Sequence, residues 1–332
     1  MKRLAVLTSG GDASGMNAAI RSVIRTAKAM KCDVYGISRG YTGLLEEDIR
    51  RLTNRDAGGI ILHGGTALKT ARCPAFFEES NQKKGAEILK KYEIDGLVVI
   101  GGDGSVQGAE ILSALGIPTV TIPATIDNDM HGTDETIGHD TAVNAVVNAV
   151  SRIRDTASSH DRAAIIEVMG RFAGNIALDA GVACGAEYIL VPEVPFSREK
   201  LARSLLEQMK EGRTNSIIIC AEGADDGRAL GEWLRERTDI DICTTILGFI
   251  QRGGLPSARD SILGSVLGAA AVKSLMNGEK GALAGMKNGE VRILPYKEAA
   301  KEAKGFKKDL YEMAGMLGAA QEKGSIAESG LE

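Results

Sequence analysis

The sequence predicts an α/β protein with two three-layer domains and mostly parallel sheets. Short apolar runs such as Leu97–Ile100 are continuous rather than alternating, and they end at glycines or polar residues. Such runs fit strands that are buried on both faces, as in parallel sheets. Between them lie helical patterns, for example His139–Ser158, where Ala142, Val146 and Val150 form one apolar stripe. This alternation favours α/β domains, and 332 residues suffice for two of them.

Each element of the first half follows from its apolar pattern and the glycine or polar cluster that ends it. Gly40–Thr53 is too polar and irregular for either class, and we expect a connection there. The expected strands are Arg3–Thr8, Asp33–Arg39, Asp95–Ile100 and Pro118–Ile122, and the expected helices are Met16–Met30, Asn81–Tyr92, Ser105–Leu115 and His139–Ser158.

The second half continues the pattern. Pro192 and Pro195 end one strand, and Ser197 is placed to cap the next helix. The tail Glu322–Glu332 is expected to fray. The expected strands are Ala163–Val168, Glu187–Val191, Ser216–Cys220, Asp241–Leu247, Ala282–Met286 and Glu290–Leu294, and the expected helices are one ending at Cys184, Arg198–Glu211, Gly227–Thr238, Ser257–Met276 and a charged one over Tyr296–Leu317.

Composition excludes several functions. Lys and Arg number 40 against 44 Asp and Glu, a net charge of −4, so no basic excess indicates a nucleic acid or an acidic membrane. No apolar stretch is long enough to span a bilayer, and the basic-then-apolar start Met1–Leu7 is too short for a signal peptide. The five cysteines lack CxxC spacing, which indicates reduced thiols, and the four histidines lack the paired spacing of a zinc site.

Two turns carry the chemistry. In Gly101-Gly102-Asp103-Gly104, glycines let the backbone approach an anion, and the helix start that follows attracts negative charge. Asp103 would repel a bare phosphate there, which suggests an intervening metal ion. The strand Pro118–Ile122 delivers Asp127 and Asp129 at its carboxyl end, where open parallel sheets bind ligands. Together these turns suggest phosphoryl transfer.

Other turns are weaker signals. Ser9–Gly15 resembles a nucleotide-phosphate loop but lacks the GK[ST] of a Walker A motif. Arg72 ends a glycine-rich loop and could clamp a phosphate, and Arg171 stands at a strand-to-helix junction on the ligand side. Taken singly, each fits a tight connection or a solvated arginine, and Asp127–Asp129 alone would fit an Asx-rich surface turn.

Several stretches, taken together, resemble the bacterial ATP-dependent 6-phosphofructokinases: Thr8–Asn17, Gly64–Arg72, Gly101–Ser105, Thr125–Asp129, Met169–Gly174 and Gln251–Gly254. GGDG is shared with kinases of lipids and of NAD, whereas PATIDND, MGRFAG and QRGG in this order and spacing are specific. The resemblance implies a phosphofructokinase-like fold, phosphorylation of the 1-hydroxyl of fructose 6-phosphate by ATP with Mg²⁺, a cytoplasmic glycolytic role and a homotetramer.

The resemblance also implies residue roles. Asp127 would be the general base, Thr125 would position the substrate, and Arg171 would stabilise the transferring group. Asp103 and Asp129 would hold Mg²⁺. The residues expected to cradle ATP are Gly11, Arg72, Cys73, Gly102, Asp103, Gly104 and Ser105. Those expected to bind the sugar phosphate are Thr125, Ile126, Asp127, Arg162, Met169, Gly170, Arg171, Glu222, Phe249 and Arg252.

Two positions favour ATP over pyrophosphate as the donor. Pyrophosphate-using relatives typically carry aspartate after GGD and lysine before TIDND, where this chain has Gly104 and Ala124. Gly104 leaves room for the α-phosphate of a nucleotide, and Ala124 offers no cation to pyrophosphate.

Two other positions depart from the ATP-dependent pattern. Cys243 and Phe249 stand where an arginine, supplied across a subunit interface to the sugar 6-phosphate, and a substrate-binding histidine are usual. Losing one charge-assisted contact costs about 1.5–3 kcal/mol. These departures leave open a kinase for another sugar phosphate, or a nucleotide-binding regulatory subunit with little activity.

An allosteric nucleotide site is partly matched. Gly59 stands where an acid is usual, and Glu211 where a lysine is usual, which reverses the sign of one phosphate contact. ADP and phosphoenolpyruvate are the expected effectors. The matching residues are Arg21, Arg25, Arg154, Gly185, Glu187 and Arg213.

The family pattern also predicts the division of the chain. An ATP- and Mg²⁺-binding larger domain is expected at 1–138 plus 251–300, and a sugar-phosphate-binding smaller domain at 139–250 plus 301–332. No repeat or low-complexity linker marks the boundary.

Overall fold

The computed structural model describes residues 1–302 and 304–318. By its internal contacts the chain forms two compact units, Met1–Thr141 with Arg252–Lys304, and Ala142–Gln251 with the described residues from Gly305 onward. Strands and helices alternate through both units, which confirms the predicted α/β class. No helix among the described residues is long and apolar enough to cross a membrane. All five cysteines are free thiols.

The first unit is built on a seven-stranded sheet. Its strands are β1 (Arg3–Ser9), β2 (Asp33–Ile37), β3 (Ile49–Leu52), β4 (Gly96–Gly101), β5 (Thr119–Pro123), β10 (Ala282–Lys287) and β11 (Glu290–Pro295). The order is β11-β10-β5-β4-β1-β2-β3, parallel except for the antiparallel edge strands β3 and β11. Full burial of β4 explains its continuous apolar run Leu97–Ile100, whereas the equally buried β5 includes Thr119 and Thr121 among its apolar residues.

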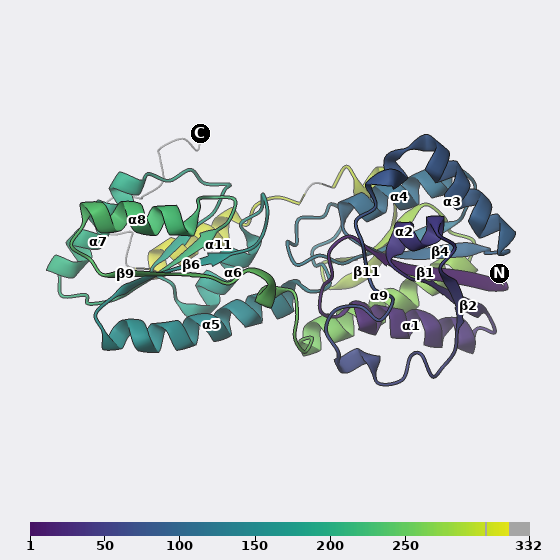
Figure 1. The fold of residues 1–332 in the computed structure, drawn as a ribbon, viewed down its shortest axis with the longest axis horizontal. Helices are drawn as coiled ribbons and strands as arrows, with labels where there is room; N and C mark the ends of the chain where they lie inside the picture. The colour runs from purple at the N-terminus through teal and green to yellow at the C-terminus, as the bar shows by residue number, and fades with distance from the viewer. Residues whose placement is uncertain (303, 319–332) are drawn as a thin grey trace. The chain divides into compact units, whose positions relative to one another are not determined.

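Helices cover both faces of this sheet, and they are α1 (Met16–Ala29), α2 (Gly40–Leu45), α3 (Glu79–Lys91), α4 (Asp103–Ala114), α9 (Ala258–Met276) and α10 (Tyr296–Ala299). Figure 1 shows α1 and α9 on one face and α2, α3 and α4 on the other. Glycines let α1 and α9 approach closely, since a Cβ at Gly268 would lie 2.7 Å from the Ala19 carbonyl oxygen.

The second unit contains a smaller, all-parallel sheet. Its strands are β6 (Ala163–Val168), β7 (Tyr188–Leu190), β8 (Ser216–Ala221) and β9 (Ile242–Ile246), in the order β7-β8-β6-β9. Its helices are α5 (His139–Ser159), whose first turn belongs to the first unit, α6 (Asn175–Cys184), α7 (Arg198–Lys210), α8 (Gly227–Arg237) and α11 (Lys308–Leu317). Leu201 and Leu205 of α7 and Leu230 and Leu234 of α8 pack on the strands in one core cluster. The Ser197 hydroxyl caps α7, as predicted, by accepting from the Lys200 N–H.

Three local predictions were wrong. Gly40–Thr53 is not irregular but forms α2 and the edge strand β3. The helix expected over Tyr296–Leu317 is two helices, α10 and α11, with non-helical backbone between them. The helix expected from Ser105 begins at Asp103, so that Asp103 lies in its first turn. The tail Glu322–Glu332 lies outside the described residues.

Candidate functional site

Three neighbouring parallel strands of the first unit end at the same level. In the strand register, Ser9 of β1 pairs with Gly101 of β4, and Gly101 pairs with Pro123 of β5. The loops that follow these strands therefore emerge side by side at the carboxyl edge of the sheet, where open α/β sheets bind ligands. These are the three loops in which the sequence places Gly11, Asp103 and Asp127.

The loop after β1 is tied to two distant segments. The Thr70 hydroxyl donates to the Gly10 carbonyl oxygen at 2.9 Å, so the exposed Arg72 follows within the same region. The Ser14 hydroxyl donates to the Gly254 carbonyl oxygen at 3.0 Å. These contacts bring the glycine loop, the Gly64–Arg72 loop and the end of the QRGG segment together within one unit.

Arg252 lies over this glycine loop. Its Nη1 donates to the Asp12 carbonyl oxygen at 3.3 Å and would lie 2.6 Å from a Cβ added at Gly11. Glycine at position 11 thus makes room for a guanidinium directly above the loop. A residue expected to bind the sugar phosphate is therefore close to one expected to bind ATP.

The turn between β4 and α4 packs against the same loop. A Cβ at Gly101 would lie 2.4 Å from Ser105 Oγ, and this hydroxyl donates to the Ser9 carbonyl oxygen at 3.1 Å. The Ser105 side chain is buried and its hydroxyl is hydrogen-bonded inside the fold, and its expected contact to ATP stays a prediction. Asp103 and Gly104, in contrast, are exposed in the first turn of α4, where the helix dipole is positive.

The loop after β5 carries the paired carboxylates. The Asp127 N–H donates to Thr125 Oγ1 at 3.2 Å, and the Asp127 side chain is 4% exposed. Asn128 between the two aspartates has a φ of +51°, in the left-handed region. Ile126, which is expected to contact the substrate, is fully buried, so its predicted contact would be made by its backbone.

Side chains from the following turn hold this loop. The Thr136 hydroxyl donates to the Thr125 carbonyl oxygen at 2.6 Å. His139 Nδ1 lies 2.8 Å from the Ile126 carbonyl oxygen. The backbone next to the aspartates is therefore held by hydrogen bonds from Thr136 and His139. A catalytic group needs such support to keep its orientation.

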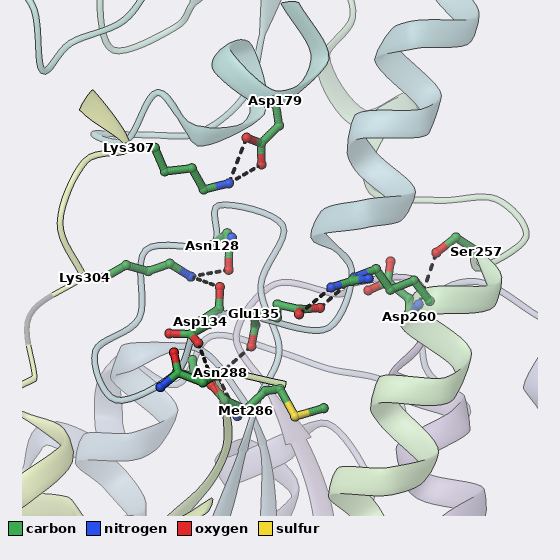
Figure 2. Close-up of polar contacts among 12 residues, drawn as sticks. Asn128, Asp134, Glu135, Asp179, Ser257, Asp260, Met286, Asn288, Lys304 and Lys307 are labelled. Carbon is green, nitrogen blue, oxygen red and sulfur yellow. Dashed lines mark hydrogen bonds and ion pairs between the residues drawn. The ribbon is translucent and has the colours of Figure 1, made fainter. Parts of the chain in front are cut away.

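Asp260 at the start of α9, which Figure 2 shows hydrogen-bonded to Ser257, fastens the end of the turn. Its Oδ1 accepts from the Gly138 N–H at 2.8 Å, and its Oδ2 accepts from the N–H and the hydroxyl of Thr141 at 2.7 and 2.5 Å. Burial raises the pKa of the Asp260 carboxyl, and the hydrogen bonds from Thr141 and Gly138 oppose that rise.

Replacing Asp260 by alanine is expected to lower the free energy of unfolding by about 2–4 kcal/mol, because buried donors lose their acceptor. Urea unfolding measures this. The matched control is Arg259→Gln on the same turn of α9, which removes an exposed ion pair with Glu135. We expect about 1 kcal/mol or less for the control. Equal losses in the two variants would contradict a fastening role for Asp260.

The second unit, considered by itself, holds most of the residues predicted to bind the sugar phosphate. Glu222 Oε1 accepts from the Arg171 N–H at 2.8 Å and from the Gly170 N–H at 3.2 Å. Gly170 and Arg171 both have positive φ, +143° and +55°. The exposed Arg171 side chain is therefore projected from a sharp turn that Glu222 stabilises at the carboxyl end of β6.

A cavity of about 180 Å³ adjoins this turn. Its lining includes Met169, Glu222 and Phe249, three of the residues predicted for the sugar phosphate. Phe249 is 82% exposed, which is unusual for an aromatic ring in a folded domain.

Arg162 is not part of this group. It precedes β6, whereas Met169 follows it, and a six-residue strand spans about 20 Å. Its Nε pairs with Asp241 Oδ2 at 2.5 Å, beside Cys243, whose partner in the register is Ala164. Arg162 and Cys243 therefore lie at the amino end of the sheet, and a single copy of this unit does not bring Arg162 to Met169.

Part of the predicted effector set does come together. Glu187 Oε1 pairs with Arg213 Nη1 at 2.9 Å and with Arg154 Nη1 at 3.2 Å, and Arg154 also donates to the Gly185 carbonyl oxygen at 2.8 Å. These four residues belong to the second unit. Arg21 and Arg25 lie on α1 of the first unit, and Arg25 donates to the Asn54 carbonyl oxygen at 3.4 Å.

The donor set fits Mg²⁺ rather than a metal held by protein alone. No cluster of three or more His, Cys, Asp or Glu suited to a metal occurs among the residues the structure describes. Asp103 and Asp129 are carboxylates on neighbouring loops of one sheet edge. Mg²⁺ is commonly held by one or two carboxylates together with waters and substrate phosphates, which is the arrangement these two residues can offer.

Comparison with known proteins decides the family. A sequence model described as phosphofructokinase matches residues 3–275. The chain is 50% identical over 317 residues to an ATP-dependent 6-phosphofructokinase of Clostridioides difficile, covering 96% of this chain and 99% of that one. This chain belongs to the phosphofructokinase family. An ATP-dependent 6-phosphofructokinase of Clostridium botulinum is 49% identical over 318 residues, with the same coverage.

Solved phosphofructokinases share the fold. The enzyme of Saccharomyces cerevisiae matches with a TM-score of 0.85 at 34% identity, covering 95% of this chain and 50% of that chain. A pyrophosphate-dependent phosphofructokinase of Marinobacter aquaeolei matches with a TM-score of 0.85 at 23% identity, covering 93% of this chain and 86% of that one. At that identity the second match supports the fold alone. The predicted resemblance and fold are therefore confirmed.

Sequence reasoning missed the residues that hold the loop after β5. Asp260, Thr136 and Lys304 contact it from positions with no motif of their own. Asp260 has a sequence signal in its position, an acidic residue in the first turn of a predicted helix, but that position does not indicate that its carboxylate is buried.

Proposed function

We propose that this phosphofructokinase is ATP-dependent and phosphorylates the 1-hydroxyl of fructose 6-phosphate. One observation carries the proposal: the glycine loop with Arg252, the start of α4 with Asp103, and the Asp127–Asp129 loop share one edge of the first sheet. A phosphate-binding surface and a buried carboxylate side by side suit phosphoryl transfer to an alcohol. The names of the close relatives support ATP as donor.

In this mechanism Asp127 accepts the proton of the 1-hydroxyl as its oxygen forms a bond to the γ-phosphorus of ATP, and the bond from the γ-phosphorus to the β,γ-bridging oxygen breaks, so that ADP leaves. The Asp127 side chain is buried, and the Thr125 hydroxyl accepts from the Asp127 backbone N–H, which fixes the backbone that carries this carboxylate and favours general-base catalysis. Arg72 and Arg171 would balance the charge of the transferring group. Mg²⁺, held by Asp103 and Asp129, would neutralise the phosphates of ATP.

The two units take different roles in this proposal. The first unit would bind ATP and Mg²⁺, and the second would bind the sugar through Met169, Gly170 and Glu222. Because Arg162 lies at the opposite end of β6 from Met169, we assign it to the sugar phosphate of a second copy of the chain. This assignment requires more than one copy of the chain, and the homotetramer and the cytoplasmic location stay predictions from the family.

Initial velocities of the purified protein test the proposal, with Mg-ATP and varied fructose 6-phosphate, and with pyrophosphate as a parallel donor. Saturable turnover with ATP at millimolar sugar phosphate or below is expected. The second candidate is a kinase for another sugar phosphate, which the exposed Phe249 in the cavity lining favours. Faster turnover of another sugar phosphate in a substrate panel would replace fructose 6-phosphate in the proposal, and ATP binding without any turnover would indicate a regulatory subunit.

Restoring the usual arginine and histidine is expected to lower the KM for fructose 6-phosphate about tenfold, through one or two charge-assisted contacts to its phosphate. The variant is Cys243→Arg with Phe249→His, measured by steady-state kinetics. Cys243 is only partly buried and lies beside Arg162, so a second guanidinium has access to the same anion. Cys243→Ser with Phe249→Tyr is the uncharged control. A KM that is the same in both variants would contradict this account.

Regulation by ADP or phosphoenolpyruvate at the Arg154–Glu187–Arg213 cluster is also proposed. In this structure the arginines pair with Glu187, so an anionic effector would compete for them. Titration of either effector should shift the fructose 6-phosphate saturation curve. A curve that does not move would remove the effector site from the proposal.

A further inference from the structure

The side chain of Lys304 reaches into the loop that carries the two aspartates. Its Nζ donates to Asn128 Oδ1 at 2.6 Å and to the Asp134 carbonyl oxygen at 2.6 Å (Figure 2). Lys304 is separated from Asn128 by 176 residues of sequence, yet both belong to the first unit. An ammonium group that donates to two oxygens at this distance makes strong, charge-assisted hydrogen bonds.

Asn128 connects the Lys304 hydrogen bond to the predicted general base, because it is the residue next to Asp127 in the chain. It stands between Asp127 and Asp129, is 3% exposed and has a φ of +51°. The left-handed conformation is unfavourable for most non-glycine residues, and asparagine adopts it more readily because its short polar side chain can hydrogen-bond locally. The amide oxygen of Asn128 also accepts from the Thr136 hydroxyl at 3.3 Å. The direction of the Asn128 side chain is thus set from two sides.

The orientation of the neighbouring carboxylate depends on this residue. Asp127 and Asn128 share a peptide unit, so rotation of Asn128 out of the left-handed region would turn the Asp127 backbone and move its carboxylate. A misplacement of about 1 Å in a catalytic group can cost 10²-fold in rate.

We propose that Lys304 is a positioning residue for phosphoryl transfer, which holds the Asp127 carboxylate in place through Asn128. The inference rests on the proposed role of Asp127 and adds a residue from the C-terminal segment to the machinery of the first unit. Lys304 acts on the acceptor side of the reaction and not on nucleotide binding.

The chain offers a matched control three residues away. Lys307 Nζ lies 2.8 Å from both carboxylate oxygens of Asp179 on α6, within the second unit. Lys307 has the same side chain as Lys304 and lies three residues from it in the sequence. Its hydrogen bonds, however, are made to α6, a helix that carries none of the predicted catalytic residues. Lys304→Met and Lys307→Met therefore remove the same group from different partners.

The test compares kcat, the two KM values and the thermal midpoint of both variants with the wild-type chain. For Lys304→Met we expect kcat to fall about 10- to 30-fold, with the KM for ATP and for fructose 6-phosphate within about twofold of wild type. For Lys307→Met we expect kcat within about twofold. Equal kcat in the two variants, or a loss in Lys304→Met that appears only in KM or only in the thermal midpoint, would overturn the inference.

A double-mutant cycle supplies the second measurement. Asn128→Gly suits the positive φ but removes the amide, so adding Lys304→Met in that background should lower kcat by no more than about twofold. A full additional loss would show that Lys304 does not act through Asn128. If Lys304→Met does not fold, Lys304→Gln, which retains a neutral donor, is measured in the same cycle with the same criteria. Wild-type activity is measured first, because its absence would refute the proposed function rather than the role of Lys304.

Discussion

Replacing Asp127 by asparagine is expected to lower kcat by a factor of about 10³–10⁴, because the substrate hydroxyl loses its general base. Asparagine has nearly the same shape as aspartate. The hydrogen bond to Thr125 Oγ1 is donated by the backbone N–H of residue 127, so the substitution leaves it in place. The fold of the loop should therefore persist. The KM for ATP should stay within about threefold, since Asp127 is assigned to the acceptor and not to the nucleotide.

The measurement is steady-state kinetics with Mg-ATP and saturating fructose 6-phosphate, together with the thermal midpoint of each protein. Asp134→Asn is the matched control, because Asp134 is an aspartate of the same loop. Its Oδ2 accepts from the Asn288 N–H at 2.7 Å. We expect Asp134→Asn to cost stability and to leave kcat within about threefold. An Asp127→Asn enzyme with more than a tenth of wild-type kcat would refute the assignment of the base.

The buried parallel strands could be predicted because their surroundings are uniform. Strands such as β4 and β5 are fully buried, so most of their residues are apolar, and the two threonines of β5, Thr119 and Thr121, are hydrogen-bonded inside the fold. Their carboxyl ends then locate the glycine and aspartate loops without any knowledge of packing. The direction of β6 also separates Arg162 from Met169, because Arg162 precedes the strand and Met169 follows it.

The edge of the sheet could not be predicted in this way. In β3, Arg50 and Arg51 are both exposed, so apolar and polar residues do not alternate along this strand. The reason is that an edge strand buries little of its surface. In α2, Gly40 and Gly43 lower helix propensity, yet a Cβ at Gly43 would lie 1.7 Å from the Ser38 carbonyl oxygen. Close approach of two segments required glycine there, and tertiary structure overrode propensity.

The residues that hold the loop after β5 could not be predicted from sequence patterns either. Lys304 donates to Asn128 across 176 residues, and Asp260 accepts from Gly138 across 122. Neither contact follows from periodicity, since each depends on where an unrelated element is placed in space. The motif residues present the chemistry, whereas the residues that hold them are dispersed along the chain.

Replacing Gly104 by aspartate is expected to lower kcat/KM for ATP about 10²-fold. Gly104 is exposed in the first turn of α4, and a Cβ there would meet nothing within 4 Å, so the substitution causes no clash. An acidic residue in the first turn of a helix is favourable for folding. The loss should come from repulsion of the ATP phosphates, since two like charges about 4 Å apart at an effective dielectric constant of about 20 repel by roughly 4 kcal/mol, and Mg²⁺ and solvent reduce this.

Gly104→Asn separates charge from size in this experiment. Asparagine has nearly the same volume, so it should reduce kcat/KM for ATP less than about fivefold, and the gap between the two variants should narrow as ionic strength rises. Equal losses would mean that bulk rather than charge excludes the nucleotide. Gly104→Asp should not gain pyrophosphate activity, because the buried Ala124 still stands where pyrophosphate-using relatives typically carry a lysine, and an alanine offers that donor no cation. Choice of donor in this chain thus depends on two loops, and changing one should impair ATP use without creating the alternative.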